Sequence, residues 1–121
     1  MVTCMDKNKL IEILNKHIKT KAEKIVFYME RIQNIKFTKL RDSVYFLDGN
    51  ILEEDLENHI YVASIKGGMF NSNYAYVVMQ LENDELSVAI YAVEGLINQH
   101  TSENVLEKLL YTLKDQYGKE K

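Results

Sequence analysis

Histidines are the residues of this chain best suited to acid–base chemistry or metal binding. They are His17, His59 and His100, and no two of them have metal-ligand spacing such as HxH or HExxH. No nucleophile elbow or reactive-cysteine signature accompanies them. We therefore predict no catalytic residue, no metal site and no cofactor, and we expect His17 to lie on a helix surface.

An acidic run and a glycine pair are the other patterns that could bind an ion or a phosphate. The run of carboxylates over 53–57 lacks the alternating oxygens and the central glycine of an EF-hand loop, so we interpret it as a solvated helix face. Gly67-Gly68 follows a strand pattern without a GK[ST] motif or a following helix, which favours a turn. Met69 and Phe70 give this loop an apolar tip, which we predict to be a second contact point.

Length and composition indicate a single globular domain over residues 1–121. Apolar residues make up 46% of the chain and charged residues 27%, and no apolar run approaches the roughly 20 residues of a membrane span. The single cysteine, Cys4, excludes a disulfide framework within one chain. The first nine residues lack the apolar stretch of a signal peptide, so we expect a cytoplasmic protein with no membrane partner. Residues 1–5 and 118–121 are expected to fray.

The net charge of −3 hides an asymmetry along the chain. Residues 1–42 carry ten basic and five acidic side chains, whereas residues 43–121 carry five basic and thirteen acidic ones. One explanation is that solvent-exposed helix faces differ in charge. The other is an acidic face that docks a basic partner or another copy of the chain. The acidic remainder argues against nucleic-acid binding, which needs a focused basic patch.

A β-hairpin over 73–82 and 85–94 is the clearest structural prediction. Asn83-Asp84 has the length and composition of a two-residue hairpin turn. The register that this turn imposes puts only apolar pairs on one face: Leu81/Leu86, Met79/Val88, Val77/Ile90 and Ala75/Ala92. A third strand over 59–66 joins them, and pairing Lys66 with Asn73 predicts that Ile60 and Val62 share this face.

Helices are expected on either side of these strands. An amphipathic stripe predicts a helix over 6–18, and a leucine stripe predicts a C-terminal helix over 102–117 that covers the apolar face. For 20–33 a helix is favoured, with a strand as the alternative because 26–28 is β-prone. Short strands are predicted over 35–39 and 43–48, and a short helix over 50–56. The fold class is therefore α+β, with an antiparallel meander packed against the C-terminal helix and an N-terminal helical segment over 6–33.

The opposite face of the predicted sheet is rich in tyrosine. It carries Tyr61, Tyr74, Tyr76 and Tyr91 with several aliphatic residues, and the hairpin register sets Tyr76 opposite Tyr91. A half-exposed sheet normally alternates apolar with charged residues, and this face has too few charges for that. Either the N-terminal helical segment covers it, or it is a contact surface for a partner, since tyrosine is enriched at protein interfaces.

The preferred functional hypothesis is a small non-catalytic protein-interaction module of the adaptor, chaperone or immunity-regulator type. It would contact a partner, or itself as a homodimer, through the four tyrosines with Met69 and Phe70. One alternative is a ligand-binding protein or enzyme with a pocket between sheet and helices, using His59 or His100. Another is a phage-type or defence inhibitor with an acidic binding surface.

Overall fold

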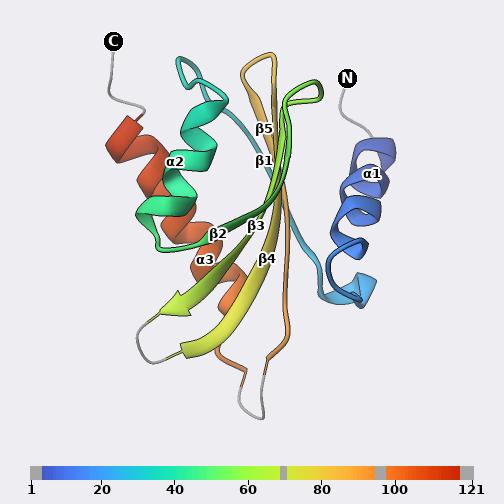
Figure 1. Cartoon of the computed structure of the whole chain (residues 1–121). Coiled ribbons are helices and arrows are strands. Elements are labelled where there is room, and N and C mark those ends of the chain that lie inside the picture. The colour runs from blue at the N-terminus through green and yellow to red at the C-terminus, as the bar shows by residue number, and fades with distance from the viewer. Residues whose placement is uncertain (1–3, 69–70, 95–97, 118–121) are drawn as a thin grey trace.

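The chain folds into three layers, with one antiparallel sheet between helices. The computed structural model describes residues 4–68, 71–94 and 98–117. The five strands have the order β1-β5-β4-β3-β2, which confirms an α+β fold with a C-terminal helix. In Figure 1, α1 lies on one side of the sheet, and α2 and α3 lie on the other. The elements are α1 (Cys4–Asn15), the 3-10 turn η1 (Ala22–Lys24), β1 (Val26–Arg31), α2 (Thr38–Phe46), β2 (Asn50–Asp55), β3 (Ile60–Gly68), β4 (Asn71–Glu82), β5 (Glu85–Ala92), α3 (Thr101–Tyr111) and the π-helical η2 (Thr112–Tyr117).

The β4–β5 hairpin has the predicted register. Asn83 and Asp84 both have positive φ, 53° and 64°, as a tight hairpin turn requires. Its apolar face forms most of the larger core, which α3 covers with Val105 and Leu109 and η2 covers with Leu113. The prediction of a C-terminal helix on this face is therefore confirmed.

The predicted register of β3 is wrong by one residue. Lys66 pairs with Tyr74, not with Asn73, because a bulge interrupts the ladder between Lys66 and Gly68. A Cβ at Gly67 would lie 2.4 Å from the Asn71 side chain, so the bulge depends on a glycine there. A one-residue shift exchanges the two faces of a strand. Ile60 and Val62 consequently lie on the α1 face.

The helix favoured over 20–33 is also wrong, and most of this segment is strand β1. The predicted helical stripe combined residues that the fold places differently, since Ile25 and Ile32 are buried whereas Ala22 and Met29 are exposed. β1 pairs with β5 at the sheet edge, from Val26 opposite Ile90 to Arg31 opposite Glu85. Pairing with β5 and the high β-propensity of residues 26–28 make this segment a strand rather than a helix.

The predictions for residues 35–56 are wrong in element type: a helix forms where strands were predicted, and a strand forms where a helix was predicted. The short strands expected over 35–39 and 43–48 are replaced by helix α2, which buries Leu40, Ser43 and Val44 at helical spacing against the larger core. The helix expected over 50–56 is strand β2, paired with β3. In the turn between them, Gly49 N–H donates to the Val44 carbonyl at 2.8 Å. Packing against the sheet overrides local propensity in both elements.

Helix α1 covers the second face of the sheet, which is one of the two interpretations given above for the tyrosine face. Leu10, Ile13 and Leu14 pack with Val62, Val78 and Ala89 in a separate, smaller core. Within the described residues, no helix has both the length and the apolar character needed to cross a bilayer.

Candidate interaction surface

Helix α1 covers the middle of the tyrosine face. Tyr91 is 5% exposed and belongs to the smaller core, where Tyr76 packs against it and remains half-buried. Tyr76 lies opposite Tyr91 on neighbouring strands, as the hairpin register predicts. These two tyrosines therefore hold α1 on the sheet.

One end of the same face extends beyond the core that α1 covers. Tyr74 is 46% exposed and Val93 is 57% exposed. Ala75 and Ala92 are the last paired residues of the hairpin, and Tyr74 and Val93 are the next residues on the two strands. On the other flank Tyr74 pairs with Lys66, which is exposed. We call Lys66, Tyr74 and Val93 the open end of the α1 face.

Tyr61 does not belong to the tyrosine face, because the β3 register turns it toward α2 and α3. There it is fully buried, and its ring stacks on Phe37 with centroids 4.4 Å apart. Its hydroxyl donates to Glu54 Oε2 at 2.6 Å. Burial, reinforced by this carboxylate, raises the pKa of Tyr61 to about 12.

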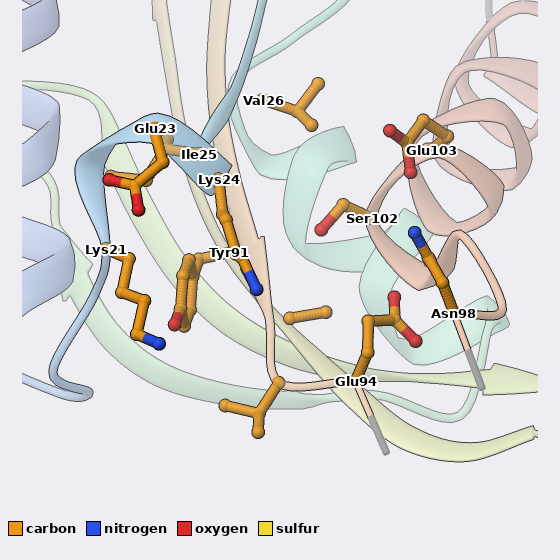
Figure 2. A pocket seen from close by; sticks show the side chains of 12 residues that line it. Lys21, Glu23, Lys24, Ile25, Val26, Tyr91, Glu94, Asn98, Ser102 and Glu103 are labelled. Carbon is orange, nitrogen blue, oxygen red and sulfur yellow. The ribbon is translucent and has the colours of Figure 1, made fainter. Parts of the chain in front are cut away.

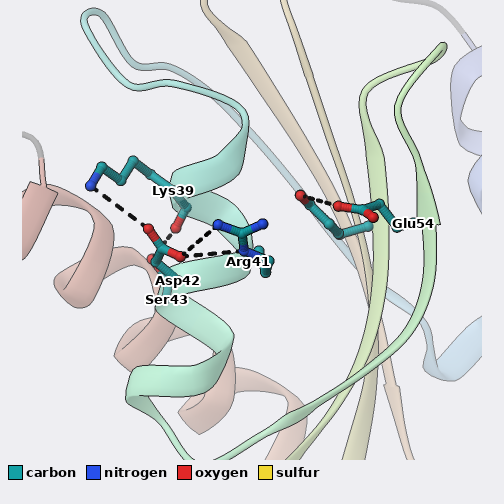
Figure 3. A network of polar contacts seen from close by, with 6 residues as sticks. Lys39, Arg41, Asp42, Ser43 and Glu54 are labelled. Atoms are coloured by element: carbon teal, nitrogen blue, oxygen red, sulfur yellow. Dashed lines mark hydrogen bonds and ion pairs between the residues drawn. The ribbon is translucent and has the colours of Figure 1, made fainter.

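A polar network on α2 lies next to this buried tyrosine (Figure 3). Asp42 accepts hydrogen bonds from Arg41 at 3.3 and 3.4 Å and forms an ion pair with Lys39 at 3.7 Å. Ser43 is fully buried, and its hydroxyl donates to the Lys39 carbonyl at 2.9 Å. These contacts pin the exposed side of α2 and satisfy its buried hydroxyl, a structural role.

A cleft of about 540 Å³ adjoins the open end. It forms because β1 starts pairing only at Val26, opposite Ile90, so the last residues of β5 have no neighbour on that side. Lys21 and Lys24 lie beside Tyr91 on one wall, while Glu94 and Asn98 lie on the other (Figure 2). Val93 belongs to both the cleft and the open end.

Glu94 is committed to the fold, since its carboxylate caps α3. It accepts hydrogen bonds from the backbone N–H groups of Thr101 at 2.8 Å and Gln99 at 3.2 Å, and from the Asn73 amide at 3.0 Å. Burial raises the pKa of Glu94, but these hydrogen bonds outweigh it and leave the pKa below its usual range. The lysines opposite are therefore the side chains of the cleft best placed to meet an anion.

The histidines and the acidic run lie apart from this surface. His17 follows the end of α1 and does not lie on a helix surface as predicted; it is partly buried, and its Nε2 lies 2.8 Å from Glu53 Oε1 on β2. His59 and His100 have positive φ at the ends of loops and are not among the described residues that line the cleft. The run over 53–57 is strand and turn, not a helix face, so its carboxylates diverge. No group of three metal-ligating side chains occurs in the described ranges.

Sequence reasoning found part of this surface. It identified Tyr74, Tyr76 and Tyr91, whereas Met69 and Phe70 lie outside the described residues and Tyr61 belongs to the opposite face. It missed the two lysines of the cleft, because a helix over 20–33 would not have brought them to the end of β5. The strand alternative for that segment was the available signal.

The chain matches no protein-family model, no curated protein and no solved structure.

Proposed function

We propose that the protein is a binding module that docks a protein segment on the open end of the α1 face. The observation that carries the proposal is the exposed pair Tyr74 and Val93, which continues a face whose other tyrosines are packed under α1. The preferred partner is an acidic segment with one apolar side chain as anchor. A cytoplasmic location is part of the proposal and rests on the sequence alone.

The apolar part of this surface favours contact with another protein. Tyrosine combines a large rigid ring with a polar hydroxyl, so it gains contact area at small entropic cost. The half-buried Tyr76 lies two residues along β4 on the same face as Tyr74. An apolar anchor from a partner would cover Tyr74 and Val93 together.

The charges around the open end select an acidic partner. Lys66 flanks Tyr74 along the sheet, and Lys21 and Lys24 flank Val93 across the cleft. Glu23 and Glu103 also line the cleft, while the carboxylate of Glu94 is held by α3. Exposed lysines contribute mainly through complementary charge, which speeds association and sets partner choice.

Peptide titration followed by amide NMR tests this proposal. The probes are two synthetic peptides with a single central phenylalanine, one flanked by aspartates and the other by lysines. The acidic peptide should shift the amide signals of Lys66, Tyr74 and Val93, and the basic peptide should not. Tyr74→Ala should weaken acidic-peptide binding by about tenfold, equivalent to about 1.4 kcal/mol.

Tyr111→Ala is the matched control, because Tyr111 is an exposed tyrosine on α3. It should leave peptide binding unchanged. Since Tyr74 is exposed, its replacement should change stability by no more than about 0.5 kcal/mol. Equal response to both peptides, or equal weakening by both variants, would contradict the proposal.

A further inference from the structure

The outer edge of β1 is the strongest remaining feature. β1 is the first strand of the sheet order and pairs only with β5. Ile32 N–H donates to the Asp84 carbonyl at 2.8 Å, so Ile32 faces the sheet interior. Backbone groups alternate in direction along a strand, so those of Phe27, Met29 and Arg31 point outward. Within the described part of the chain, no hydrogen bond engages these outward groups.

The opposite edge of the sheet is protected in a way that β1 is not. β2 has a bulge between Ile51 and Glu53 and carries three consecutive carboxylates over 53–55. Bulges and charges of one sign are common devices against edge-to-edge pairing. β1 pairs without a register shift over its whole length, and its two charged residues have opposite signs.

We infer that β1 pairs antiparallel with β1 of a second copy, which makes a continuous ten-stranded sheet. Outward groups must meet outward groups, and only one such register pairs all three outward residues of β1 with one another. It places Met29 opposite Met29 of the second copy and Phe27 opposite Arg31. Both pairs are of the hydrogen-bonded type.

The side chains at this seam are compatible on both faces. On the α1 face, Met29 is 38% exposed and would contact its own copy at the two-fold axis. Arg31 would lie beside the Phe27 ring, over which Lys7 Nζ already lies at 5.3 Å from the centroid. On the other face, Tyr28 would lie opposite Glu30. Within one chain the Tyr28 hydroxyl already donates to Glu30, whose carboxylate is neutralised by Lys114 at 2.7 Å. No like charges are directly opposed at the seam.

The helices leave room for this arrangement. α1 packs mainly over β4 and β5, and it reaches the sheet edge through Lys7, which lies over the Phe27 ring. Four strand spacings of about 4.8 Å would then separate the two α1 helices by roughly 19 Å. This exceeds the 8–10 Å of packed helices, so the seam closes without a clash.

Disulfide trapping provides the most direct test. The chain's only cysteine is removed by Cys4→Ser, and Met29→Cys is added. Opposed residues of a hydrogen-bonded pair lie about 5.5 Å apart at Cα, within the range of a disulfide. Mild oxidation should therefore give a covalent dimer of twice the 14.1 kDa chain. Arg31→Cys in the same background should not crosslink, because this register sets Arg31 opposite Phe27.

Solution mass gives an independent measurement. Sedimentation of the wild-type chain should yield a dimer, and Met29→Lys should raise its Kd at least about tenfold, because two ammonium groups would oppose each other at the axis. Leu52→Lys, an equivalent change on β2, should leave the dimer intact. Circular dichroism confirms that each variant folds.

A monomeric wild-type chain, equal crosslinking at 29 and 31, or dissociation by Leu52→Lys alone would overturn the inference. The Tyr74→Ala variant should remain dimeric, so this test is separate from that of the proposed function.

Discussion

Replacing Tyr61 by phenylalanine should make the stability of the fold less sensitive to alkaline pH. In the wild-type fold, burial and Glu54 raise the pKa of Tyr61 from 10.0 to about 12. The unfolded chain therefore loses this proton at lower pH than the folded chain does. The resulting stabilisation is complete below about pH 10 and is lost as the pH rises through about 12.

The size of this effect follows from the shift in pKa. A shift of two pKa units corresponds to about 2.7 kcal/mol well above pH 12, and about half of it, roughly 1.4 kcal/mol, is already lost near pH 11. The hydrogen bond from Tyr61 to Glu54 stabilises the wild type by about 1 kcal/mol at neutral pH. The phenylalanine variant should accordingly be less stable at neutral pH and equally or more stable near pH 11.

Urea unfolding of both proteins at neutral pH and near pH 11 measures this crossover. Ultraviolet difference spectra between wild type and Tyr61→Phe report the ionisation of Tyr61 directly. Glu54→Gln separates the two causes, and it should lower the pKa of Tyr61 only part of the way back to 10.0, because burial is the largest single cause of the shift. A stability difference that is the same at both pH values would refute the reasoning, as would ionisation of Tyr61 near pH 10.

Two further predictions concern structural devices. Glu94→Gln should destabilise the fold by about 1 kcal/mol at neutral pH by weakening the cap on Thr101. Because the pKa of Glu94 is lowered, this difference should begin to shrink below the ordinary carboxyl pKa of 4.5 and disappear only as the pH falls through the lower pKa of the folded state. A difference in urea unfolding that stays constant as the pH falls would contradict it. Gly49→Ala should cost about 1–3 kcal/mol, since its Cβ would lie 2.8 Å from Val44 and 2.9 Å from Ile65. An unchanged thermal midpoint would show that the turn can adjust.

The parts of the fold predicted from sequence are those where two independent signals agree. The β4–β5 hairpin has both a turn that sets the register and a pattern that needs it, and the structure has that register. The register of β3 depended on a loop length alone. The bulge beside Gly67 leaves no periodic trace in the sequence.

Residues 20–56 show why single-sequence reasoning misassigns short elements. β1, α2 and β2 have six, nine and six residues, so each is decided by what it packs against. The same errors affected the candidate site. Placing 20–33 in a helix concealed both the cleft lysines and the free edge of β1.

The two proposed contacts would act together on one face of the molecule. Antiparallel pairing of β1 keeps both α1 faces on the same side of the continuous sheet. The open end lies six residues along the strands from the row of Met29, a distance of roughly 20 Å. The two-fold axis sends the second open end in the opposite direction, so the sites would lie about 40 Å apart along the strands. A dimer with two such sites could hold two segments of one partner. Met29→Lys, which breaks the seam, would then weaken binding to a bivalent partner and leave the affinity for a single peptide unchanged.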